Sequence, residues 1–310
     1  MRDDSAVPTA PERWFDRLEI RVRDEAFAER IGKQLAEGPP DAFGVTDLPK
    51  NGLELKLIAL AADAVAAVLA DYGAAPSRPP LSPDRVHILS AEEFAARIGP
   101  RTGGKTQYGH AYLRRNDDWI KFLRILTHEL THRSAFLSIV VTEGPADEPG
   151  EDCALILPTG VGLGRAGLPP KRELSFDGLD EAVTEILARE ARKRLARTIA
   201  GMNAAQRDDL AENIFYPGPI MVTAKLIEAV AGGTQDFRGI RTMLVQDYVS
   251  GEARFLDRLA EQDEAAYQAV RTMGPTHADA IQAARRLNWP VLAERIARLR
   301  RDDGGRPAAS

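Results

Sequence analysis

The segment His128-Glu129-Leu130-Thr131-His132 combines, within five residues, groups that bind a metal ion and a group that moves a proton. Because the two histidines are four residues apart, they lie on one face of a helix, about one turn from each other. That spacing allows both imidazoles to reach a single tetrahedral Zn²⁺. Glu129 points slightly off that face, where it can take a proton from metal-bound water. The segment therefore predicts two zinc ligands and a general base; the alternative is an ordinary amphipathic helix with two hydrogen-bonded histidines.

The residues before the motif predict the helix that positions these groups, over about residues 117 to 136. Asn116, Asp117 and Asp118 suit the N-terminal cap and the first turn. The apolar residues that follow recur at helical spacing and form a stripe that can face the core, namely Ile120, Leu123, Leu126 and Leu130. We therefore expect the motif on a buried helix of about five turns.

A catalytic zinc ion needs a third protein ligand, and the sequence restricts the choice. The extended pattern of the metzincins requires a glycine and a histidine further along, but Ala135 and Ser138 occupy those positions. His277 is remote, and His87 and His110 precede the motif. We therefore expect an acidic third ligand.

A second helix is predicted to begin near Asp177, which suits an N-cap. Glu181 and Glu185 share a face of this helix, and their charges repel each other in an isolated helix. A metal site gives a role to both residues: Glu181 binds zinc, and Glu185 accepts the free N–H of a ligating histidine. The alternative is a solvent-facing pair of glutamates.

Together the two segments resemble the gluzincins, the thermolysin-like zinc metallopeptidases. In that family a second motif, roughly N-E-x-x-S/T-D/E, follows H-E-x-x-H on a second helix, and the corresponding segment here is L-D-E-A-V-T-E. The resemblance implies that Glu181 is the third zinc ligand and that Glu185 supports His128. Thr184 is then a hydroxyl inside the helix, and Asp180 replaces the usual asparagine.

The resemblance covers about residues 85 to 250 and is closest to the short bacterial members, the minigluzincins. It implies an α+β, zincin-like fold, in which a small sheet packs on the H-E-x-x-H helix and a mostly helical C-terminal part follows. The stretch between His132 and Glu181 is longer than in thermolysin. Within it, Val140 to Glu173 predicts a strand hairpin with a loop rich in proline, glycine and acidic residues.

A metallopeptidase also needs a hydrogen-bond donor for the oxyanion of the transition state. Tyr216 opens a predicted helix and resembles the tyrosine of the Y-x-x-G segment in large zinc aminopeptidases, although Gly218 is one residue closer. The alternative is a tyrosine that packs at a helix start. His277 is the second candidate for the oxyanion donor, by analogy with thermolysin. Tyr112 or an arginine is the third. The aminopeptidase pattern G-x-M-E-N is absent from the sequence, so exopeptidase action with a captured N-terminus is not supported.

Two further segments carry weaker signals. Thr102 to Lys105 lacks the spacing of a phosphate-binding loop and is set aside. Residues 108 to 113 alternate like a strand. In gluzincins the strand before the metal helix is the edge that pairs with substrate, which would place His110 or Tyr112 at the cleft. A plain strand position is the favoured interpretation of both.

Composition limits the remaining classes of function. The 310 residues are 44% hydrophobic and 28% charged, which is typical of a soluble globular protein. A net charge of −5 argues against general nucleic-acid binding, and we interpret the basic runs at Arg189 to Arg197 and Arg295 to Arg301 as solvated helix ends. The single cysteine, Cys153, excludes an intrachain disulfide and suits a reducing compartment.

The segments along the sequence predict the cellular location and the domain organisation of the protein. The N-terminus lacks the features of a secretory signal, and the apolar helix Leu53 to Leu69 contains too many charges to cross a bilayer, so a cytoplasmic protein without membrane contact is expected. We predict a disordered tail (1–12), N-terminal helices and a zincin-like core (13–202), a helical subdomain (203–302) and a second disordered tail (303–310). Oligomeric state is left open.

These patterns favour a zinc-dependent metallopeptidase that hydrolyses peptide bonds. Zn²⁺ bound by His128, His132 and Glu181 activates a water molecule, and Glu129 acts as the general base. The expected partner is a peptide or protein substrate whose identity the sequence does not specify. The alternative is a non-catalytic, zincin-like domain that binds or regulates another protein.

Overall fold

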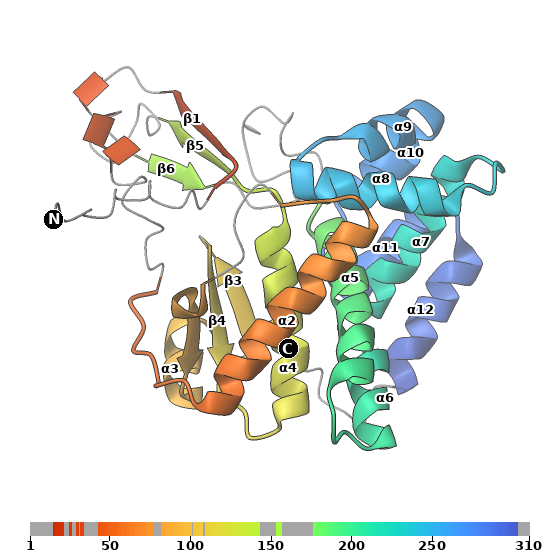
Figure 1. The fold of residues 1–310 in the computed structure, drawn as a ribbon. Helices are drawn as coiled ribbons and strands as arrows, with labels where there is room; N and C mark the ends of the chain where they lie inside the picture. Colours follow the sequence, from red (N-terminus) through yellow and green to blue (C-terminus); the bar gives the residue numbers. More distant parts are fainter. Residues whose placement is uncertain are drawn as a thin grey trace, which may run out of the picture.

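The structure is a computed structural model that describes residues 15–21, 25–26, 29–30, 32–33, 43–76, 82–100, 102–107, 109–142, 153–156 and 176–302. The chain is α+β, with two small sheets and a mostly helical remainder, as the sequence predicts. The predicted tails, 1–12 and 303–310, lie outside the described residues. Figure 1 shows the long helix that carries the motif between one sheet and the C-terminal helices.

The sheet next to the motif has the strand order β2-β4-β3, with β2 (Val86–Leu89), β4 (His110–Arg114) and β3 (Gly104–Gln107). β4 is parallel to β2 and antiparallel to β3. The helix α3 (Ala91–Arg97) connects β2 to β3, and the Ser90 side chain caps its first turn. The predicted strand near 108–113 is therefore confirmed as β4.

The position of β4 corrects one expectation. The strand directly before the motif helix lies in the middle of the sheet, and the edge strand is β3. Alternate residues of a strand point to opposite faces, so Ala111 and Leu113 join the main core while Tyr112 stacks on His87 on the other face. His110 hydrogen-bonds His87 as well, with 2.7 Å between ring nitrogens. Both His110 and Tyr112 thus face away from the motif helix.

The second sheet has the order β1-β5-β6, with β1 (Arg17–Arg21), β5 (Ser138–Thr142) and β6 (Cys153–Ile156). β5 and β6 are antiparallel, which confirms the predicted hairpin, while residues 143–152 and 157–175 are outside the described part. β1 corrects the expectation that the predicted unit 13–202 begins with helices. It pairs in parallel with β5, a partner more than a hundred positions away, and such a pairing leaves no local signal.

The motif helix is α4 (Trp119–Ser134), close to the predicted 117–136. The Asp118 side chain accepts hydrogen bonds from the backbone of Ile120 and Lys121, and these bonds satisfy two of the unpaired N–H groups at the helix start. The predicted apolar stripe is buried and packs against α2 (Gly52–Asp71) and α5 (Asp177–Thr198). α4 is therefore held rigidly between the sheet and two long helices.

The helix α5 begins at its predicted cap residue, one position earlier than expected. Phe176 precedes it in a left-handed conformation, and Asp177 is the first helical residue rather than the N-cap. The cause lies in tertiary packing, because the Gly178 N–H donates to the Met273 carbonyl. A Cβ at Gly178 would lie 2.5 Å from the Gly274 carbonyl oxygen, so only glycine allows this approach.

The C-terminal part consists of consecutive helices: α6 (Ala204–Glu212), α7 (Pro217–Ala231), α8 (Phe237–Ser250), α9 (Arg254–Gln262), α10 (Glu264–Arg271), α11 (His277–Arg286) and α12 (Pro290–Asp302). Gly232 and Gly251 end α7 and α8 with positive φ angles. One hydrophobic core joins these helices to α2, α4 and α5.

The domain boundary at residue 202 stays a prediction. Among the described residues, no single helix is long and apolar enough to cross a membrane; α6 and α7, bent by 61°, meet that measure only as a pair.

Candidate metal centre

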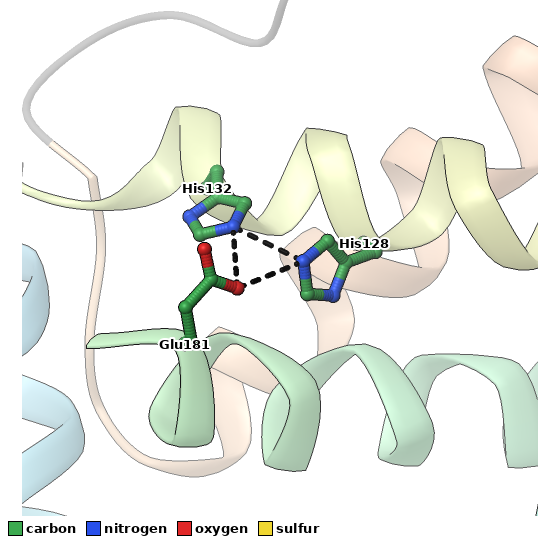
Figure 2. Close-up of side chains that lie close together, drawn as sticks. All are labelled: His128, His132 and Glu181. Atoms are coloured by element: carbon green, nitrogen blue, oxygen red, sulfur yellow. Dashed lines mark hydrogen bonds and ion pairs between the residues drawn. The ribbon is translucent and has the colours of Figure 1, made fainter. Parts of the chain in front are cut away.

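Three side-chain atoms from α4 and α5 converge on one point. Nε2 of His128 and Nε2 of His132 are 3.1 Å apart. The Glu181 Oε2 atom lies 3.2 Å from the first and 3.3 Å from the second. Figure 2 shows the triangle that these atoms form between the two helices. The structure thus brings together the three residues that the sequence predicts as ligands.

The triangle has the size and chemistry that a metal ion requires. Ligands at about 2.0–2.1 Å in a tetrahedral zinc site are roughly 3.3–3.4 Å from one another. The Glu181 Oε2 atom is buried and has no hydrogen-bond donor, although both imidazole nitrogens are near it. A buried carboxylate oxygen without a donor is costly, and a cation between the three atoms would satisfy it. Two imidazoles and one carboxylate are also a ligand set found in catalytic zinc sites.

The electrostatics of the site favour a cation. Burial lowers the pKa of His128, but the nearby carboxylates of Glu181 and Glu185 outweigh it and raise the pKa to about 10. Burial raises the pKa of Glu181, but the charges of the two histidines hold it well below its usual range. The carboxylates therefore stabilise positive charge at this point, whether it is carried by a proton or by a metal ion.

Glu185 orients the first histidine. Its Oε2 atom lies 3.0 Å from Nδ1 of His128, so the ring donates there and keeps Nε2 free for a ligand role. Arg192 donates to the same carboxylate at 2.5 Å, and the Phe215 backbone N–H donates at 3.2 Å. Burial raises the pKa of Glu185, but Arg192 and His128 outweigh it and lower the pKa to about 2. The carboxylate is therefore ionised at neutral pH.

Arg192 corrects the interpretation of the first basic run as a solvated helix end. Its side chain is fully buried, and it also donates to the backbone carbonyls of Leu210 and Asn213. A buried charge of this kind is tolerated because each of the three guanidinium nitrogens donates to a partner. The sequence did contain a signal: Arg192 follows Glu185 by seven residues, which is two helical turns on the same face.

A chain of hydroxyl groups orients the second histidine, and sequence reasoning missed it. The Thr131 carbonyl can only accept, so the Tyr248 hydroxyl donates to it at 3.4 Å. The Thr184 hydroxyl then donates to Tyr248 at 2.6 Å and accepts from Nδ1–H of His132 at 3.2 Å. This order places the His132 proton on Nδ1 and leaves Nε2 free. Thr184 and Tyr248 are both fully buried.

Glu129 lies under the edge strand β3. Its side chain is 7% exposed, and Thr106 of β3 donates to its Oε2 atom at 2.8 Å. A Cβ at Gly104 would lie 2.8 Å from the Glu129 Oε1 atom, so the strand passes this close only because residue 104 is glycine. The segment set aside as a phosphate loop is thus the start of β3, and its glycines bring the strand onto α4.

Tyr216 is the N-cap residue of α7, and its ring centroid lies 5.5 Å from that of His128. Burial raises the pKa of its hydroxyl well above the usual value, and the charges of Glu181, Glu129 and Glu185 raise it further. The hydroxyl therefore stays protonated and can donate a hydrogen bond. The competing candidates lie elsewhere: Tyr112 is on the outer sheet face, and His277 begins α11 behind its cap residue Thr276.

Two cavities meet at this site, and both are lined by His128, Glu129 and Tyr216. The smaller, of about 120 Å³, extends toward the N-terminal end of α4. The larger, of about 380 Å³, extends past His132 and Glu181 toward Pro275. Gly104 borders both cavities, so β3 runs along the cleft that they form. His277 and Tyr112 are not among the described residues that line either cavity.

Comparisons of the chain with protein-family models, with curated proteins and with solved structures found no significant match. The argument about function therefore depends on the geometry of the site and on the two motifs that position it.

Proposed function

We propose that the protein is a zinc-dependent hydrolase of peptide bonds with a gluzincin-like arrangement of its site. One observation carries the proposal: two imidazole nitrogens and a carboxylate oxygen converge between α4 and α5, in a cleft that also contains the Glu129 carboxylate. A zincin-like fold is part of the proposal. The order of the two motifs and the sheet packed on α4 support it.

His128, His132 and Glu181 would hold the metal. A Zn²⁺ ion supplies Lewis-acid polarisation of the scissile carbonyl and lowers the pKa of a water molecule. Glu129 accepts the proton of the attacking water and delivers it to the leaving amine. The protonated Tyr216 hydroxyl donates to the oxygen on which negative charge develops. Each group lines the cleft where this chemistry would take place.

The edge strand β3 supplies a means of holding the substrate. Among the described residues it pairs with β4 alone, so its second edge has backbone groups that can pair with an extended peptide. Because Gly104 and Thr106 contact Glu129, a peptide along this edge would pass directly over the proton acceptor. The proposal thus includes an extended peptide as the substrate.

The second candidate is a non-catalytic domain that binds a protein partner. Glu129 argues against it, because a binding module has no use for a buried carboxylate that sits in the metal cleft and is held by Thr106. Zinc without any turnover would favour this second candidate.

The deciding experiment measures metal content by elemental analysis and cleavage of a peptide library by the zinc-loaded protein. We expect one Zn²⁺ per chain and turnover that falls by roughly 10²–10⁴-fold in Glu129→Gln, since a positioned proton-transfer group contributes about that much. Glu129→Gln should keep its zinc and its melting temperature. Wild type that cleaves no peptide, or a variant that cleaves at the wild-type rate, would contradict the proposal. Lys56→Glu on the outer face of α2 is a control for nonspecific effects of substitution.

A further inference from the structure

The smaller cavity has a charge pattern that the proposed chemistry does not use. Arg114 and Lys121 line it together with Ile125 and Phe215, next to His128 and Glu129 of the metal site. We call it the basic cavity. It adjoins the larger cavity, where Asp177, Asp180 and Lys105 mix both signs of charge.

Local geometry fixes the walls of the basic cavity. Lys121, Ile125 and Glu129 are four residues apart on α4, so they form a stripe from the first turn of the helix to the metal site. Arg114 ends β4 opposite this stripe, and its backbone N–H donates to the Gly103 carbonyl at 3.0 Å. A Cβ at Gly103 would lie 2.5 Å from Ile125 Cδ1, so glycine lets the segment just before β3 close the cavity.

The part of the chain that the structure describes offers no counterion to the two cations of the basic cavity. Among the described residues, neither the Arg114 nor the Lys121 side chain has an ion pair or a hydrogen bond, although both side chains are partly buried. Nearby arginines show the contrast: Arg115 pairs with Glu54, and Arg124 pairs with Asp209. The sole acid in the lining is Glu129, which Thr106 holds.

Two unpaired like charges in one cavity repel each other and are partly desolvated, so an anion placed between them relieves both costs. Ile125 and Phe215 add apolar walls that suit the methylene groups of an acidic side chain. The cavity shares His128 and Glu129 with the metal site, so a group bound there belongs to a residue close to the scissile bond. A carboxylate of the peptide substrate has the required charge, planarity and size.

We propose that the basic cavity binds a carboxylate of the substrate, and that the protein cleaves next to an acidic residue or close to a free C-terminus. This inference rests on the proposed function, and it names the substrate class for that site. Arg114 and Lys121 are then specificity-determining residues. An acidic side chain and a terminal carboxylate share the same chemistry, and the experiment separates them.

The first arm uses zinc-loaded Glu129→Gln, which should turn peptides over roughly 10²–10⁴-fold more slowly than wild type, and measures dissociation constants by calorimetry. Peptides from the library are compared in matched pairs with Glu or Gln at each position near the bond, and with a free or an amidated C-terminus. We expect the loss of the recognised carboxylate to weaken binding about 10–100-fold, the usual effect of losing a charge-assisted hydrogen bond. A loss on Glu→Gln identifies a side chain, and a loss on amidation identifies the chain terminus.

The second arm reverses the charge of the cavity. Lys121→Glu and Arg114→Glu should each lower kcat/KM for the acidic peptide about 10–100-fold and raise it for the peptide with Lys at the same position. Lys56→Glu changes net charge equally on a surface outside both cavities and should leave the preference unchanged. Zinc content and melting temperature show whether each variant is folded. Lys121→Met, which keeps an unbranched stem, should abolish the preference without reversing it.

The outcomes separate this inference from the proposed function. Equal dissociation constants for every matched pair, or the same preference in Lys121→Glu and wild type, overturn the carboxylate site and leave peptidase action intact. A wild type that cleaves no peptide overturns the proposed function. In that case the binding arm still decides the carboxylate site, because it requires no turnover.

Discussion

At the scale of residues, the site is a set of pairs in which one group orients another. Glu185 holds His128 through Nδ1, and Thr184 holds His132 through the same ring atom. Both rings thereby present Nε2 to the same point, and Glu181 completes the triangle. On the proposed function, Glu181 is a ligand and Glu185 only orients one, so we expect their substitution to affect zinc binding differently although they share one helix face.

Glu181 and Glu185 should respond differently to substitution. Glu181→Ala removes a ligand and should abolish stable zinc binding. Glu185→Ala removes only the acceptor for His128 and should weaken zinc binding about 10–100-fold, the usual effect of losing such a partner. Competition with a chromogenic chelator measures both affinities, and circular dichroism checks folding because Arg192 loses its partner in the second variant. Equal affinities in the two variants would disprove the assignment.

Tyr216→Phe tests the oxyanion donor. If the hydroxyl donates to the oxygen that gains charge, turnover should fall roughly 10²–10³-fold while zinc content, melting temperature and KM stay nearly constant. His277→Ala is the comparison, because His277 begins α11 and lines neither cavity among the described residues. A silent Tyr216→Phe together with a defective His277→Ala would move the donor role to His277.

Much of the site could be predicted because its parts are periodic. The spacing from His128 to His132 and from Glu181 to Glu185 fixes faces of helices without knowledge of the fold. Thr106, Tyr248 and the buried role of Arg192 were missed. Helical periodicity shows which face a residue occupies, but it does not show which distant element packs against that face.

At the scale of elements, α4 and α5 carry the ligands, while β3 and α8 fix details of the site. Helix bounds were predicted within about two residues, which is the usual precision for helix ends. The start of α5 was missed by one residue because Gly178 packs on Met273 and Gly274, a contact between distant segments. The edge position of β3 was missed because strand order depends on pairing across the sheet.

The hydroxyl chain gives α8 a measurable effect on the metal site. Tyr248→Phe deprives the Thr184 hydroxyl of its acceptor, so Thr184 no longer enforces the Nδ1–H tautomer of His132. We expect zinc affinity to fall roughly 10-fold, and ¹⁵N spectra of the zinc-free protein to show more of the other His132 tautomer.

Tyr267→Phe is the matched control for this change. It removes a tyrosine hydroxyl from α10, where the ring packs near Phe176 and away from the hydroxyl chain. Its zinc affinity and His132 spectrum should equal those of wild type. Unchanged zinc affinity in Tyr248→Phe would show that the hydroxyl chain is only a packing feature.

At the scale of the whole molecule, the candidate metal centre joins two helices that a long intervening segment separates in the sequence. The same helices contribute to one hydrophobic core that reaches from α2 to α12. A ligand that binds the folded state alone stabilises it in proportion to the logarithm of its concentration. Zinc should therefore stabilise the entire chain, not only the cleft.

Removal of the metal should lower the melting temperature. At free zinc about 1,000-fold above the dissociation constant, linkage contributes about 4 kcal/mol, which corresponds to a shift of roughly 5–10 °C for a protein of this size. Differential scanning calorimetry with and without a chelator measures the shift. Glu181→Ala should show no zinc-dependent shift, and a wild type insensitive to the chelator would argue against the site.

The free edge of β3 restricts the conformation in which a substrate chain can bind. Native helices and the inner strands of native sheets already use their backbone hydrogen-bonding groups, so they have none to offer a strand. On the proposed function, cleavage sites would lie where a target chain is extended and its backbone is unpaired, as in unfolded segments. The protein would then discriminate by conformation before it discriminates by sequence.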